Sequence, residues 1–234
     1  MEKILDFDYR CILQKKTGLI QYYDEASLPL ITDNNPSFWE DEVSVGEGKS
    51  YGVEMELSYK SPKIYSSIQY TFMNSSRQFE GVNQGEEFLF IYDQPHNLRV
   101  DFSINITANA KFTLGWNWHT GTPYTKYKSS FKFNPLVNDY WFGAEAEDGS
   151  EGIASAINAE RLPDYHSLNA KFDINWGIKY NQSFSIGVTN IYNRKNAYFS
   201  YEYVDLFNDE NITVNKTTFP ILPSLRYQIK FGGK

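Results

Sequence analysis

The chain has 234 residues, of which 41% are hydrophobic and 17% aromatic, including 18 Tyr and 17 Phe. The mean hydropathy is −0.52 and no run of 18 apolar residues occurs, so we expect no transmembrane helix, and the net charge of −7 argues against nucleic acid as a partner. A transmembrane β-barrel is compatible with these values, because its lumen and its loops are polar.

Alternation of apolar and polar residues recurs along the chain and predicts β-strands. A less regular strand is expected within residues 3–23. Seven regular stretches follow, and in chain order they are residues 51–59, 64–72, 98–107, 111–119, 166–177, 184–190 and 225–231. No helical period competes with this pattern, so the expected fold class is all-β, antiparallel and up-and-down.

Each of these strands has one apolar face, most clearly in HSLNAKFDINWG, residues 166–177. We expect the apolar faces to contact lipid through Leu98, Val100, Phe102, Ile104, Phe112, Leu114, Trp116, Leu168, Phe172, Ile174, Trp176, Phe184, Ile186, Leu225, Tyr227, Ile229 and Phe231. The opposite faces are expected to line a water-filled lumen through Glu54, Glu56, Arg99, Asp101, Lys111, Lys171, Asp173 and Arg226. Alternation alone is equally compatible with a soluble antiparallel sandwich.

The lengths of the connections favour the membrane interpretation. Tight turns are expected at 60–63, 108–110 and 178–181, and they alternate strictly with long links at 24–47, 74–94, 120–163 and 192–222. In an up-and-down sheet this order places every short turn at one end and every long loop at the other, which is typical of outer-membrane barrels. Loops of this length also count against a compact soluble domain.

Strand length and aromatic positions agree with that interpretation. About ten residues rising ~3.3 Å each, with a tilt of ~45°, span roughly 23 Å, close to the ~25 Å apolar band of such barrels. Tyr59, Phe112, Trp176, Phe184 and Phe231 lie next to the short turns or near the end of the chain, where a girdle of rings would meet the lipid headgroups.

Seven phrases, in order, resemble TonB-dependent outer-membrane receptors, especially those of Bacteroidetes. They are WEDEVSVGEGKSYGVEMEL, YTFMNSSRQF, YDQPHNLRVDF, TGTPYT, RLPDYHSLNAKFDINW, SFSIGVTNIYNRKNAYF and LPSLRYQIKF. The resemblance extends from about Asp8 to Phe231. It implies a 22-stranded barrel, of which residues 1–234 would form about the last eight strands, with the plug domain and the earlier strands outside this sequence. Gly232, Gly233 and Lys234 depart from the family, which usually ends on the aromatic residue.

The resemblance also implies a location and partners. The location is the bacterial outer membrane, and the partners are its lipid, the remaining barrel strands and the plug domain in the same or a separate chain. TonB would act indirectly through the plug, and a surface lipoprotein is a further partner that the resemblance allows. Because eight strands can close a small barrel and open edges do not survive in lipid, the chain either pairs with further strands or closes alone.

No constellation for catalysis or metal binding is visible. The three histidines, His96, His119 and His166, lack metal-ligand spacing, and no nucleophile elbow or phosphate loop occurs, so we expect neither an enzyme nor a cofactor. Tyr124, Tyr127 and Trp141 in the link 120–163 are weak candidates for stacking on a sugar or aromatic ligand, and packing on their neighbours is the plainer interpretation.

The expected function is that of the barrel wall and extracellular loops of a TonB-dependent transporter that takes up a ligand. One alternative is a self-contained eight-stranded barrel with an adhesive or structural role. Another is a soluble sugar-binding β-sandwich.

Overall fold

A computed structural model describes residues 3–23, 43–129, 153–154, 156–177, 181–205 and 210–231. The regular structure of these residues is β-strand, apart from one short 3-10 turn, η2 (Asn83–Gly85). No helix in this part of the chain is long and apolar enough to cross a membrane. The fold is all-β, as the alternation predicts.

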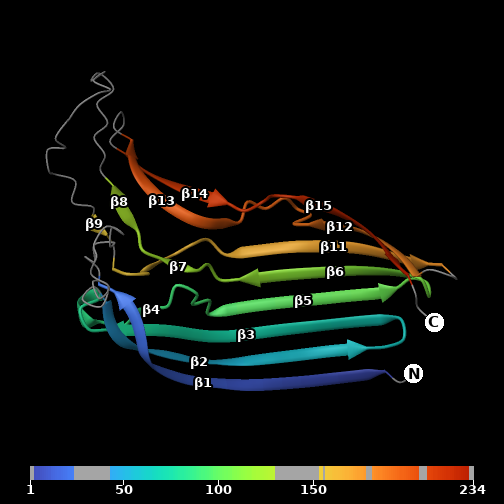
Figure 1. Cartoon of the computed structure of the whole chain (residues 1–234), viewed down its shortest axis with the longest axis horizontal. Coiled ribbons are helices and arrows are strands. Elements are labelled where there is room, and N and C mark those ends of the chain that lie inside the picture. The colour runs from blue at the N-terminus through green and yellow to red at the C-terminus, as the bar shows by residue number, and fades with distance from the viewer. Residues whose placement is uncertain are drawn as a thin grey trace.

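The main sheet contains nine strands, eight of which follow one another in a single path (Figure 1). Across the sheet, this path is β1 (Ile4–Tyr22), β2 (Val43–Lys60), β3 (Ile64–Phe79), β5 (His96–Asn105), β6 (Ala110–His119), β11 (Tyr165–Trp176), β12 (Asn181–Thr189) and β15 (Leu222–Lys230). The short strand β4 (Phe88–Leu89) pairs with β3. All neighbours in this sheet are antiparallel, which confirms that part of the prediction.

The short connections lie at one end of the sheet, as expected. Ser61 N donates to Ile64 O over 2.8 Å in the turn between β2 and β3, and Ile106 N donates to Ala110 O over 2.9 Å in the next turn. Of the third short turn, predicted at 178–181, residues 178–180 lie outside the described residues, and Asn181 begins β12. Both ends of the chain are at this end of the sheet, because β1 begins opposite Lys60 and β15 ends opposite Asn181 (Figure 1).

The first three strands are long, and the second and third are longer than the sequence indicates. They contain 19, 18 and 16 residues, so residues 43–47 and 74–79, expected in links, belong to strands. Their ladders continue through polar residues because backbone hydrogen bonds need no apolar face. A β-bulge between Thr17 and Leu19 interrupts β1, where Gly18 adopts a φ of +71° that suits glycine.

Three of the long links, 74–94 with β4, 120–163 and 192–222, carry strands that were not predicted. β13 (Ala197–Asp205) and β14 (Glu210–Thr217) form a hairpin within the link 192–222, and β8 (Tyr127–Ser129) and β9 (Ile153–Ala154) extend its sheet. The pairing of β13 with β8 is parallel, so the antiparallel rule does not hold in this smaller sheet. A further pair joins β7 (Pro123–Tyr124) to β10 (Glu160–Arg161).

Buried apolar side chains are concentrated at the long-loop end. Among the described residues, the buried hydrophobic side chains are those of Phe79, Val82, Phe88 and Leu162. The first three form one cluster, against which Leu19 and Ile157 pack. No described element covers the apolar face of the main sheet with a second layer, and the outer strands β1 and β15 each pair with one neighbour, so the described strands do not close on themselves.

Candidate functional site

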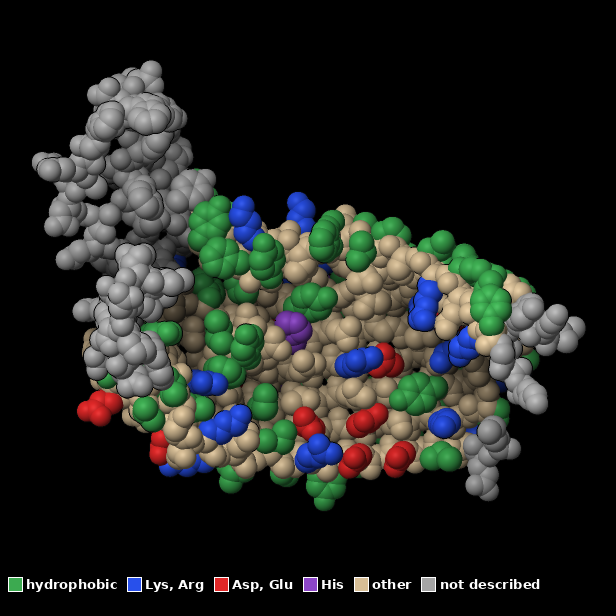
Figure 2. All heavy atoms as spheres, viewed as in Figure 1, with side chains coloured by type: hydrophobic (Ala, Val, Ile, Leu, Met, Phe, Trp, Pro, Cys, Tyr) green, Lys and Arg blue, Asp and Glu red, His purple; other side chains and the backbone are tan. Residues whose placement is uncertain are grey.

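The strand register places all the predicted lumen-facing residues on one face of the main sheet, called here the polar face. Glu56 is opposite Gln69, which is opposite Arg99, and Asp101 lies in the next row. At the other side of the sheet, Lys111, Asp173 and Arg226 fall into one row through Ser185 of β12. Figure 2 shows acidic and basic side chains spread over the face of the sheet that it presents.

Ion pairs within single strands organise this face. Arg99 Nε lies 2.6 Å from Asp101 Oδ2, and Lys171 Nζ lies 2.7 Å from Asp173 Oδ1. Ser185 Oγ donates to the same Asp173 oxygen over 2.5 Å. The basic side chains are half exposed, at 56% for Arg99 and 52% for Lys171, so the face is built to be in contact with water.

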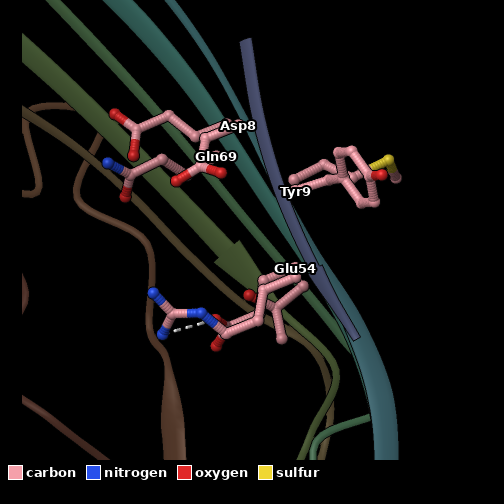
Figure 3. Close-up of a pocket in the computed structure, with 8 residues that line it drawn as sticks. Asp8, Tyr9, Glu54 and Gln69 are labelled. Atoms are coloured by element: carbon pink, nitrogen blue, oxygen red, sulfur yellow. Dashed lines mark ion pairs between the residues drawn. The ribbon is translucent and has the colours of Figure 1, made fainter. Parts of the chain in front are cut away.

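A shallow pocket at the β1 edge shows how the two faces separate (Figure 3). Asp8, Glu54 and Gln69 gather on one side of the sheet, whereas Tyr9 points to the other. Arg10 Nη1 approaches Glu54 Oε2 at 3.8 Å, and both side chains are well exposed. Such an exposed pair contributes little to stability, so this pocket is best described as solvated wall.

The predicted lipid-facing residues share the opposite face, called here the apolar face. Phe172 is opposite Phe112 on one side and Ile186 on the other, and Phe112 is opposite Ile104. The same register joins all the remaining members of the set, which are Leu98, Val100, Phe102, Leu114, Trp116, Leu168, Ile174, Trp176, Phe184, Leu225, Tyr227, Ile229 and, next to the end of β15, Phe231. The exposed fractions reach 70% at Leu225 and 74% at Phe231.

Strands β1 to β3 extend this apolar face. On β1 it continues through residues that the sequence prediction did not resolve, namely Leu5, Phe7, Tyr9, Cys11 and Leu13. Leu13 is 91% exposed. The alternation from Leu5 to Leu13 is the signal that would have identified them, but the two consecutive apolar residues Ile12 and Leu13 obscure it.

On β1 and β2 the apolar face ends at a charged row. Leu13 is opposite Tyr51, but in the next outward row Lys15 is opposite Lys49. Lys15 Nζ lies 2.8 Å from Glu47 Oε2, and Lys49 Nζ lies 3.2 Å from Glu87 Oε2. About nine residues per strand therefore form an apolar band, which rises ~26 Å along the strand before any tilt is counted.

Histidine, tyrosine and tryptophan side chains border the same band on the following strands. Tyr70 Oη and His96 Nδ1 are 2.8 Å apart, and the ring of Trp118 stacks on His96 with the centroids at 6.3 Å. His166 Nδ1 lies 2.6 Å from Tyr192 Oη. These amphipathic rings suit a boundary between an apolar and an aqueous phase. No cluster of three potential metal ligands occurs among the described residues.

Beyond the band, a buried ion pair joins two long links. Asp93 is fully buried, its Oδ1 accepts from Ser75 N at 2.6 Å, and its Oδ2 pairs with Arg161. Arg161 Nη1 also donates to the carbonyl oxygens of Asp93, at 2.9 Å, and Gly121, at 3.1 Å. The ion pair and the Phe79 cluster, together called here the loop platform, join the links to the end of β3.

A second set of hydrogen bonds fixes the link after β12. Asn190 is buried with a φ of +58°, which asparagine tolerates, and its amide donates to Arg194 O over 2.8 Å. Asn196 Nδ2 donates to His166 O over 3.0 Å, while His166 N donates to Asn196 Oδ1 over 3.1 Å. These contacts attach the start of β11 to the link and give Asn190 and Asn196 of the phrase NIYNRKN structural roles.

The three weak ligand candidates receive no support as a group. Tyr124 is half-buried in β7, opposite Glu160 of β10. Tyr127 lies in β8, but its side chain is outside the described residues, as is the whole of Trp141. Aromatic residues that do gather at the long-loop end include Tyr22, Tyr23, Phe88 and Phe90, which were not predicted as site residues.

No protein-family model matches the chain, and no curated protein is similar to it in sequence. The features on which a function can rest are therefore the two opposed faces of the sheet, the boundary of the apolar band, and the loop platform.

Proposed function

We propose that this chain forms part of the wall and the extracellular loops of a TonB-dependent outer-membrane receptor. The observation that carries the proposal is the uncovered apolar band, which extends from β1 to β15 and ends on β1 and β2 at the Lys15–Lys49 row. A position in the bacterial outer membrane accounts for both the band and its boundary. The short turns would then face the periplasm and the long links the exterior.

The size of the band argues against a soluble sandwich. Eight strands spaced ~4.8 Å apart and about nine residues tall present roughly 1,000 Å² of apolar face. A soluble monomer rarely exposes a patch of more than a few hundred Å². Contact with hydrocarbon would remove this apolar face from water, and no second layer among the described residues does so.

The polar face favours a wide lumen over a small closed barrel. The interior of an eight-stranded barrel is just wide enough to be filled by side chains. Arg99 and Lys171 are half exposed to solvent, and desolvating them in such an interior would be costly. A larger barrel, in which the edges β1 and β15 pair with further strands, leaves these charges in water and satisfies both edges.

Coupling to TonB through a plug domain rests on the resemblance of the seven sequence phrases to that family. The polar face suits contact with a plug, because its ion pairs offer hydrogen-bonding groups to a polar partner. The ligand would be taken up through the lumen, and the chain would act as a transporter wall without catalysis.

Membrane partition tests the proposal against a sandwich. We expect the full chain to remain in the outer-membrane fraction after carbonate washing and to require detergent for purification. Purification of a monodisperse, folded chain without detergent would contradict the proposal. Failure of the lipid-face variants described in the Discussion to affect insertion would contradict it independently.

Strand-edge cross-linking distinguishes a large barrel from a self-contained one. Cys11 lies on β1, and a second cysteine can be placed on β15 by Leu225→Cys, Tyr227→Cys or Ile229→Cys. In a closed eight-stranded barrel, one of these would come within disulfide distance of Cys11. We expect no intramolecular disulfide after oxidation in the membrane, and formation of one would support the small barrel instead.

A further inference from the structure

A pocket lies where the polar face meets the loop platform. Its walls come from five segments, and its lining includes Tyr22, Tyr23, Arg77, Phe90, Ile91 and Asn158. The parity of β3 puts Arg77 on the same side of the sheet as Gln69 and Thr71. The pocket therefore opens at the long-loop mouth of the polar face.

Arg77 is the only cation in the lining of this pocket, and its charge is uncompensated among the described residues. Its guanidinium carbon lies 3.7 Å from the centre of the Phe90 ring, and no described carboxylate forms an ion pair with it. The buried carboxylate of Asp93 is already paired with Arg161. Register places Lys16 in the same row, two strands away, which adds to the positive potential.

Rings and an aliphatic side chain form the rest of the pocket. Tyr22, Tyr23 and Ile91 are 48%, 38% and 50% exposed, so their faces are open to a ligand. A guanidinium stacked on one ring keeps its edge free for a bidentate contact with an anion. The exposed tyrosines offer flat surfaces on which a second ring can stack.

The loop platform holds the pocket in shape. Phe90 N donates to Ser75 O over 2.9 Å, and Asp93 N donates to Phe90 O over 2.7 Å. Asn158 Nδ2 donates to Leu89 O over 2.8 Å, and Asn158 N donates to Thr125 Oγ1 over 3.0 Å. These bonds tie four of the five pocket segments to one another, so little ordering would accompany binding.

We propose that this pocket binds a carboxylate carried on a ring, with Arg77 holding the carboxylate and the tyrosines holding the ring. The biological role of the pocket, ligand capture at the mouth of a receptor, rests on the proposed function, but the binding itself does not. Sugar acids and aromatic acids share this chemistry. The hydroxyl of Thr125, which accepts from Asn158 N, and the side chain of Gln21 also line the pocket and favour a ring with hydroxyl groups.

Binding of matched acids and neutral analogues to the full chain in detergent tests the proposal by calorimetry. One pair is a glucuronate-terminated disaccharide and its glucose-terminated counterpart, and the other is 4-hydroxybenzoate and 4-hydroxybenzamide. We expect at least one acid to bind about tenfold or more tightly than its neutral partner, because the acid gains charge-assisted hydrogen bonds. The pair that shows the preference identifies the source of the carboxylate.

Three variants assign the effect to Arg77. Arg77→Gln should remove the preference for the acid, and Arg77→Lys should retain only part of it, since lysine keeps the charge but lacks the planar fork. Lys60→Gln, which removes the same charge at the short-turn end, should bind like the parent. An unchanged proteolysis pattern at the long-loop end would show that the loop platform is intact in each variant.

The proposal is overturned if neither acid is preferred, if neither binds, or if Arg77→Gln binds an acid as tightly as the parent chain. Because membrane partition is measured separately, a chain that inserts but shows no preference removes this inference alone. A chain that binds the acid but purifies without detergent removes the receptor proposal and leaves the pocket.

Discussion

The apolar band of the main sheet and the loop platform differ in where their apolar and charged side chains lie. In the sheet, apolar side chains such as Leu225 point outward and are exposed, while charged ones such as Lys171 share the other face. In the platform, Phe79 and Val82 are buried, and the charge of Asp93 is buried with them. Apolar side chains are buried in the platform, as in a water-soluble protein, whereas on the sheet they are exposed.

The two regions therefore differ in whether their apolar side chains are buried within the chain. The platform supplies its own core, because its apolar side chains contact one another and its carboxylate has a cationic partner. The strands of the sheet are held together by backbone hydrogen bonds, and its apolar face is not covered by any described part of the chain. Substitutions in the band should therefore change stability in lipid, and substitutions in the platform should change stability locally. Each of the following predictions tests that contrast.

The largest effect is expected from a charge placed in the middle of the apolar band. Phe172→Arg or Ile104→Arg should destabilise the membrane-inserted form by ~2–4 kcal/mol, because an arginine at mid-depth must be accommodated in hydrocarbon. The two residues belong to one row through Phe112, so their effects should be similar. Urea titration of the chain refolded in lipid vesicles measures the change.

Asp173→Asn, next to Phe172 but on the polar face, is the matched control and should do little. It keeps the shape of the side chain and an acceptor for Ser185 Oγ. If the variants on both faces had equal effects, the distinction between the faces would be wrong.

The platform should lose stability locally when its buried ion pair is broken. Asp93→Ala leaves Arg161 without its partner and Ser75 N without an acceptor. We expect a loss of about 2 kcal/mol in the platform, less than for a fully buried pair because Arg161 is 29% exposed. Hydrogen exchange should rise in residues 75–93 and 156–164.

Exchange in β11 and β12 should stay unchanged in the Asp93 variant, because the band does not depend on the platform core. Loss of protection throughout the main sheet would show instead that the two regions unfold together.

The smallest effect is expected at Glu87, which lies outside the band. Hydrogen bonds from Ser76 and then Lys49 lower the pKa of Glu87 below its ordinary value. The stabilisation is therefore present above the ordinary glutamate pKa and is lost as the pH falls through the lowered value. Because the side chain is 47% exposed, Glu87→Gln should cost only a few tenths of a kcal/mol at neutral pH.

The pH dependence provides the check. The small difference between the parent chain and Glu87→Gln should vanish in acid, where both side chains are neutral. A difference that persists unchanged in acid would mean that the hydrogen bonds to Glu87 do not depend on its charge.

The sequence predicts the band well, because each strand there must keep a period of two residues and the pattern is visible without any partner. The polar set from Glu54 to Arg226 and the apolar set from Leu98 to Phe231 each fall on one face for this reason. Whether these faces meet lumen and lipid stays a prediction.

The loop platform and the Arg77 pocket could not be predicted in the same way. Asp93 and Arg161 are 68 positions apart, and no local pattern announces their pairing. Likewise, Tyr22, Arg77 and Phe90 converge only through strand register and the return of the chain along β4. The hairpin of β13 and β14 lies within the link 192–222. The length of a link does not distinguish a hairpin from an irregular loop, so the hairpin was not predicted.

The orientation of the two faces can be tested residue by residue along β11. With Cys11 replaced by serine, single cysteines at positions 168–176 would be spin-labelled in the membrane-inserted chain. Collision with oxygen should be high at 168, 170, 172 and 174, and collision with a water-soluble nickel chelate should be high at 169, 171 and 173. The same accessibility to both probes at neighbouring positions, or the opposite phase, would contradict the assignment of the apolar face to lipid.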